Sequence, residues 1–227
     1  MKSSRSSVTF FASTRVCCLI VFLCSTVASA FIDEDIEFAR TMLVRETDNK
    51  IEKAFFSPGQ SIKKMLLGLI KNETQEICAA LFRLTDPDVA QALSDAFARG
   101  VKISLITDYG NFAERYEKVT KLFNSGIPIR YYVVPYSIMH HKFYIFMNNF
   151  LENPILVAGS ANSTKGGLGR NFEDYIVTNS PDLLESYHQQ FVKLEDNTHS
   201  GIPKIKKYVT KVILHTTKNI LCTKFKR

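Results

Sequence analysis

Apolar residues recur along the chain in two alternating patterns. Stretches with apolar positions three or four residues apart, such as Ile62, Met65 and Leu66, predict helices. Short apolar runs between them, such as Glu76 to Phe82, predict buried strands. The expected strands are 54–56, 76–82, 101–107, 127–134, 138–146, 155–161 and 175–178, and the expected helices are 62–70, 89–99, 116–123 and 181–194. This alternation predicts an α/β domain with repeated crossovers.

Segments of different character flank this domain. Residues 31–53 are charged and place Ile36, Ala39 and Leu43 on one side, which predicts a first helix. In the domain itself, a helix-start signal at Asp86 and a helix stop at Gly100 bound the helix expected over 89–99. We therefore predict a single folded domain over 54–195 and a separate C-terminal tail over 196–227.

The first thirty residues form a segment of their own. They contain three basic residues and no acidic residue, then the apolar stretch Val16–Val27, then small residues up to Ala30. This order predicts a signal peptide cleaved near Ala30, and hence a periplasmic or secreted protein. The main alternative is an uncleaved N-terminal membrane anchor, although the apolar core is short for a span. An organellar presequence fits this compact core less well.

The formal net charge of +7 is unevenly distributed. Residues 1–30 contribute +3, residues 31–200 carry 18 basic and 22 acidic residues, and residues 201–227 contribute +8 without an acid. A mildly acidic body argues against a broad nucleic-acid surface. Drawn as a helix, the tail separates its lysines from an apolar side, which suits an anionic membrane or nucleic acid. A strand or a solvated packing extension is the alternative.

Two cysteines remain after residue 30, Cys78 and Cys222. Two cysteines exclude a cysteine-based zinc site and a disulfide scaffold. Cys78 lies in a strand-like apolar run, so we expect a buried free thiol; pairing with Cys222 in an oxidising compartment is the alternative.

Two of the predicted strands contain polar residues whose side chains could take part in a reaction. Alternate residues of a strand share a face, so His140 and Lys142 point one way and His141 points the other. Ser160 and Asn162 share a face in the same manner, among small residues that allow close backbone approach. Imidazole, ammonium, hydroxyl and carboxamide without clustered acids suit an anion whose charge rises during a reaction, and phosphate is the obvious candidate.

These residues resemble the signature of the phospholipase D superfamily. Three motifs occur in the order of that family: His140-x-Lys142, Gly159-Ser160-x-Asn162 and Asn171-x-Glu173. The resemblance covers about residues 54–195 and is strongest to short members with one such motif, which include bacterial endonucleases and mitochondrial cardiolipin hydrolases. It implies an α/β fold of the phospholipase D type, with a mixed β-sheet flanked by helices on both faces and a single catalytic domain.

The resemblance also implies roles for these residues. His140 is the expected nucleophile, Lys142, Ser160 and Asn162 bind phosphate, and Glu173 or Ser160 orients the imidazole. No metal ion and no cofactor is expected. A chain with one motif resembles half of an active site, because the attacking group and the acid must lie on opposite sides of phosphorus. A homodimer would supply the second half.

The sequence departs from the family pattern at Met147, where an aspartate is usual. Alternation places position 147 on the face opposite Lys142, so we expect its loss to affect support of the fold more than phosphate chemistry. The leading hypothesis is a nuclease acting on DNA or RNA. The alternatives are a phospholipase D or cardiolipin hydrolase acting on anionic phospholipid, and a degenerate module that only binds phosphate.

Overall fold

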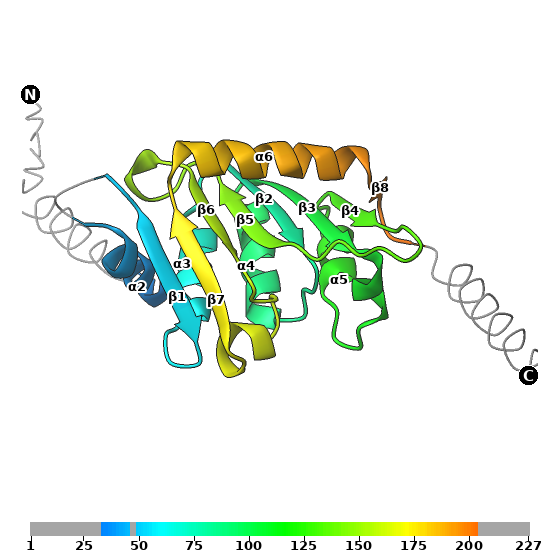
Figure 1. Cartoon of the computed structure of the whole chain (residues 1–227), viewed down its shortest axis with the longest axis horizontal. Coiled ribbons are helices and arrows are strands. Elements are labelled where there is room, and N and C mark those ends of the chain that lie inside the picture. The colour runs from blue at the N-terminus through cyan, green and yellow to red at the C-terminus, as the bar shows by residue number, and fades with distance from the viewer. Residues whose placement is uncertain (1–32, 46–48, 204–227) are drawn as a thin grey trace, which may run out of the picture. The chain divides into compact units, whose positions relative to one another are not determined.

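A computed structural model describes residues 33–45 and 49–203, and its compact unit begins at Glu34. Helices and strands alternate along it (Figure 1). In chain order they are α2 (Glu34–Leu43), β1 (Glu52–Ser57), α3 (Ile62–Asn72), β2 (Glu76–Leu81), α4 (Pro87–Ala98), β3 (Lys102–Asp108), η1 (Tyr109–Ala113), α5 (Val119–Asn124), β4 (Ile129–Tyr132), β5 (Lys142–Phe146), η2 (Phe150–Glu152), β6 (Ile155–Gly159), η3 (Gly166–Arg170), β7 (Glu173–Thr178), α6 (Pro181–Asp196) and β8 (His199–Ser200).

The strands form one mixed sheet in the order β1-β7-β6-β5-β2-β3-β4-β8. β2, β3 and β4 are parallel, as expected when a helix crosses over between consecutive strands. β5 is antiparallel to both β2 and β6, and β7 is antiparallel to both β6 and β1. The strands β5, β6 and β7 therefore extend the parallel part of the sheet with antiparallel strands.

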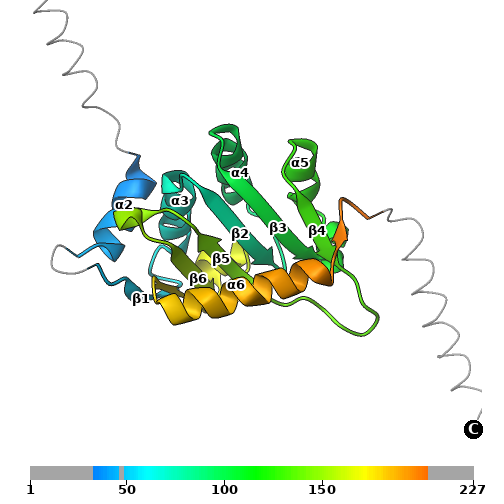
Figure 2. The ribbon, with the colours of Figure 1, turned by 90° about the horizontal axis from the view of Figure 1, so that it is seen from above.

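Helices cover both faces of the sheet. Figure 2 shows α6 along one face and α3, α4 and α5 on the other. Alternate residues of β5 divide between these layers: Tyr144 and Phe146 enter the larger core under α3 and α4, while Phe143 and Ile145 pack in a smaller cluster with Leu184 of α6. This arrangement confirms the predicted fold class.

Several predicted elements are shorter in the structure. The helix expected over 31–53 covers Glu34–Leu43, and β1 begins at Glu52. The strand expected over 138–146 begins at Lys142, where pairing with Leu81 of β2 starts. The strand expected over 155–161 ends at Gly159, and the helix expected over 116–123 begins at Val119. Apolar periodicity continues into the flanking segments, but a strand ends where its hydrogen-bonding neighbour ends.

The predicted signal segment, most of the basic tail and Cys222 lie outside the described residues. Within them, β8 occupies part of the predicted tail and pairs with β4. Cys78 is a buried free thiol, as predicted, and burial raises its pKa to about 12. No helix in the described part of the chain is long and apolar enough to cross a membrane.

Candidate active site

The antiparallel order of β5, β6 and β7 brings three chain segments to one edge of the sheet. β5 begins, β6 ends and β7 begins at this edge, which is the lower end of the sheet in Figure 1. Residues of the three predicted motifs therefore meet there. A pocket of about 330 Å³ opens beside the first two motifs, and Asn162, Asn171 and Glu173 are not part of its lining. It is lined by His140, His141, Lys142, Phe143, Ala158, Gly159, Ser160 and Tyr187.

His140 and Lys142 lie two residues apart, on either side of the point where β5 begins. The Lys142 side chain is buried, and its Nζ donates a hydrogen bond to the carbonyl oxygen of His140 at 2.6 Å. Burial lowers the pKa of Lys142, and the negative charge of Glu173 opposes this change. Desolvation and then the Lys142 charge lower the pKa of His140, which is exposed. Both shifts disfavour the charged forms of these side chains, and the positive charge of Lys142 contributes to the shift of His140.

Ser160 and Glu173 form a hydrogen-bonded pair across the end of β6 and the start of β7. Ser160 Oγ donates to Glu173 Oε2 at 2.6 Å and accepts from the Asp174 N–H at 3.1 Å. The strands approach closely here because Gly159 has no side chain: a Cβ at this position would lie 2.2 Å from the Asp174 carbonyl oxygen. The expectation that small residues permit this approach is confirmed.

Asn162 lies two residues beyond Ser160, after the end of β6, and is half-buried. Its Oδ1 atom is buried and has no hydrogen-bond partner among the described residues, so the fold does not use this oxygen. The η3 segment packs against the Asn162 backbone, since a Cβ on Gly167 would lie 2.3 Å from the Asn162 carbonyl oxygen. Ser57, at the end of β1, holds the same segment by donating to the Asn171 carbonyl oxygen at 2.9 Å.

The structure brings His140, Lys142 and Ser160 to the same pocket, with Glu173 bonded to Ser160. Within residues 33–45 and 49–203, no hydrogen bond joins the His140 ring to Ser160 or Glu173, so the orienting role stays a prediction. His141 faces α6, where its Nε2 lies 3.3 Å from Gln190 Nε2. The described residues contain no cluster of three or more histidine, cysteine or acidic side chains that could hold a metal ion.

Met147 packs on the α6 side of the sheet, in the cluster that contains Ile145. Lys142 alternates with Tyr144 and Phe146, whose side chains enter the opposite core. The prediction that position 147 faces away from Lys142 is therefore confirmed.

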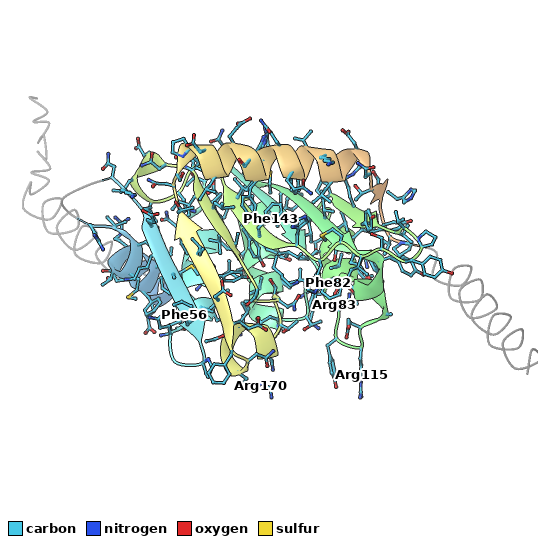
Figure 3. All side chains as sticks on the ribbon, viewed as in Figure 1. Phe56, Phe82, Arg83, Arg115, Phe143 and Arg170 are labelled. Carbon is cyan, nitrogen blue, oxygen red and sulfur yellow. The ribbon has the colours of Figure 1, made fainter. Side chains whose placement is uncertain are left out.

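Sequence reasoning missed Phe82 and Arg83 at this site. Both residues follow β2, and Figure 3 labels Phe82 directly above Arg83 in the lower half of the domain. The ring of Phe82 lies 4.5 Å from the His140 ring, centroid to centroid, and the Arg83 guanidinium lies 3.9 Å from the Phe82 centroid. Only the pairing of β2 with β5 places them there, and no motif in the sequence indicated it.

Comparisons with known proteins agree with this geometry. A family model described as "Cardiolipin synthase, PLD-like domain" matches residues 66–195. The chain is 28% identical over 137 residues to a phospholipase D of Rickettsia conorii, a match covering 60% of this chain and 66% of that protein. It is 30% identical over 123 residues to a mitochondrial cardiolipin hydrolase of Chlamydomonas reinhardtii, covering 54% and 52%. These matches span less than two thirds of each relative's length.

Among solved structures, the phospholipase D family member Nuc from Salmonella typhimurium superposes with a TM-score of 0.60 and 26% identity. The match covers 68% of this chain and 100% of the Nuc chain. The family model, the shared fold and the three motifs together show that this chain belongs to the phospholipase D-like domain family.

Proposed function

We propose that this protein hydrolyses phosphodiester bonds without a metal ion, through a phosphohistidine formed on His140, and that its substrate is DNA or RNA. The observation that carries the proposal is the convergence of His140, Lys142 and Ser160 on one pocket. An imidazole with a lowered pKa beside an ammonium group matches a nucleophile that attacks an anionic phosphate.

The reaction has two displacements at phosphorus. A ring nitrogen of His140 forms a bond to phosphorus while one P–O ester bond breaks, and the leaving oxygen takes a proton from an acid on the far side. The group that acted as the acid then takes a proton from water, and the water oxygen attacks phosphorus and displaces His140. This second step releases a phosphate monoester. Lys142 and the Asn162 amide balance the charge on the non-bridging oxygens, while Ser160 and Glu173 support the pocket.

The acid on the far side is the partner subunit's His140 in a homodimer. This part of the proposal is supported by the single His-x-Lys motif in the chain and by an exposed apolar surface beside the site. Phe56 and Ile176 lie on one face of β1 and β7 and are 57% and 50% exposed. Phe56 pairs with Asp174, the neighbour of Ser160, so a second copy covering this face would approach the pocket.

A polynucleotide substrate is supported by the resemblance of the three motifs to short family members with one such motif, which include bacterial endonucleases. The basic residues after Gly201, with a net charge of +8, would add attraction for a polyanion. Export after cleavage near Ala30 belongs to the same proposal, and an uncleaved anchor is the alternative.

A phospholipid substrate is the second candidate, and one surface feature favours it. The turn between β4 and β5 exposes Val134, Tyr136 and Ile138 by 44%, 95% and 59%, directly before His140 in the chain. A hydrogen bond of 3.0 Å between Tyr132 Oη and Ser137 Oγ closes the base of this turn. Exposed apolar side chains next to a phosphate site suit contact with a lipid surface, including a cardiolipin-containing one.

Plasmid nicking in the presence of EDTA tests the leading proposal. The purified protein should nick, His140→Gln should be inactive, and His188→Gln, an exposed histidine on α6, should behave as wild type. Headgroup release from cardiolipin-containing vesicles is assayed in parallel. Vesicle hydrolysis without nicking would identify phospholipid, and not nucleic acid, as the substrate. If neither assay showed activity, the chain would be a phosphate-binding module, and Met147→Asp would then test whether the departure from the family pattern at this position is the cause.

A further inference from the structure

We infer that Phe82 and Arg83 are positioning residues of the phosphate site: the Phe82 ring supports the side chains of His140 and Lys142, and Arg83, stacked on the same ring, adds a positive charge beside the nucleophile. This inference rests on the proposed phosphodiesterase function. It adds two residues that lie outside the three motifs of the site.

The sheet places Phe82 at the site. Leu81, the last residue of β2, pairs with Lys142, the first residue of β5. The next residue, Phe82, donates its N–H to the carbonyl oxygen of His141 at 2.8 Å and so continues the pairing for one step beyond the strands. This bond links Phe82 to the segment that carries His140.

Three cationic or titratable side chains contact the Phe82 ring. The His140 ring meets it edge to face with centroids 4.5 Å apart, Lys142 Nζ lies 5.2 Å from its centroid, and Arg83 Cζ lies 3.9 Å from it. The negative face of an aromatic ring attracts cations, so the Phe82 ring stabilises Lys142 and Arg83 near each other despite their mutual repulsion, while the His140 ring packs against it edge to face.

Carboxylates fix the Arg83 guanidinium in this place. Its Nε lies 2.8 Å from Glu114 Oε1, and one terminal nitrogen lies 3.8 Å from Asp108 Oδ1. Asp108 also accepts the backbone N–H of Met139 at 3.0 Å, directly before His140. Arg83 and the nucleophile segment are thus tied to the same carboxylate at the end of β3.

Arg83 has an electrostatic consequence for the nucleophile. The charged groups that act on His140 are Lys142, Arg83 and Asp108; the two cations lower its pKa, after desolvation, and Asp108 raises it. The same positive charges attract the substrate phosphate.

The test is the titration of His140 by NMR in the wild-type protein and in single variants. His140→Gln assigns the His140 resonance. Arg83→Met should raise the pKa of His140 on the order of 0.5 pH unit, the size expected when a nearby unit charge is removed in a partly hydrated site. Arg83→Lys should restore most of the difference. Lys121→Met, on the exposed side of α5, removes an equal charge elsewhere and should leave His140 unchanged.

The activity of the same variants is measured in the nicking assay. Arg83→Met should move the acidic limb of the kcat/KM profile to higher pH, because more of the nucleophile is then protonated. Phe82→Leu should lower kcat on the order of tenfold with a smaller change in KM, and Phe82→Tyr should retain activity. A folded Arg83→Met protein with the wild-type His140 pKa would overturn the role of Arg83, and wild-type kcat in Phe82→Leu would overturn that of Phe82. A shifted His140 pKa without nicking by the wild type would overturn the proposed function alone.

Discussion

Glu73 offers a test of how the far end of β5 is held. Its side chain is 1% exposed. Oε1 accepts the backbone N–H groups of Gln75, Glu76 and Asn148 at 2.9, 3.1 and 2.9 Å, and Oε2 accepts Asn149 Nδ2 at 3.1 Å. One carboxylate therefore joins the start of β2 to the segment that follows β5.

Glu73→Ala removes the acceptor for four donors. An unsatisfied buried donor costs about 1–3 kcal/mol, and water reaches some of these half-buried groups, so we expect a loss of about 3–5 kcal/mol in the free energy of unfolding. Glu73→Gln keeps one acceptor oxygen but turns its amide nitrogen toward another donor, and should lose about 1–2 kcal/mol.

Urea denaturation at constant pH, followed by circular dichroism, measures these losses. Glu52→Ala is the matched control: its carboxylate is 63% exposed, so a change below about 0.5 kcal/mol is expected. Because Glu73 acts at the end of β5 remote from Lys142, nicking per folded molecule should remain near wild type. A Glu73→Ala protein as stable as the Glu52→Ala control would refute the argument.

Two further substitutions and one labelling experiment test the site and its surroundings. Glu173→Gln removes the charge that raises the pKa of Lys142, so the alkaline limb of kcat/KM should move to lower pH; an unmoved limb would contradict the coupling. Gly159→Ala brings a Cβ to 2.2 Å from the Asp174 carbonyl oxygen, and should lower stability by about 2 kcal/mol in urea and reduce nicking. Burial and a pKa raised to about 12 should keep Cys78 unlabelled by thiol reagents in the native protein and allow labelling in urea, as read by peptide mass mapping; rapid native labelling would contradict this.

The sequence by itself determined the fold class and the three motifs of the site. Apolar periodicity is a local property, so helices such as α3 and α6 and buried strands such as β2 could be predicted from spacing alone. The helix start at Asp86 was predictable for the same reason, and its side chain accepts the N–H groups of Asp88 and Val89. Alternation along β5 also predicted that Met147 faces away from Lys142.

Only the tertiary structure decided where strands end and which distant residues meet. His140 and Ser160 lie outside β5 and β6 because the ladders stop at Lys142 and Gly159, and pairing partners are not encoded in local pattern. The contact of Phe82 with His140 depends on β2 lying beside β5, although some sixty residues separate them in sequence. Non-local pairing therefore completes the pocket around motifs that the sequence already contains.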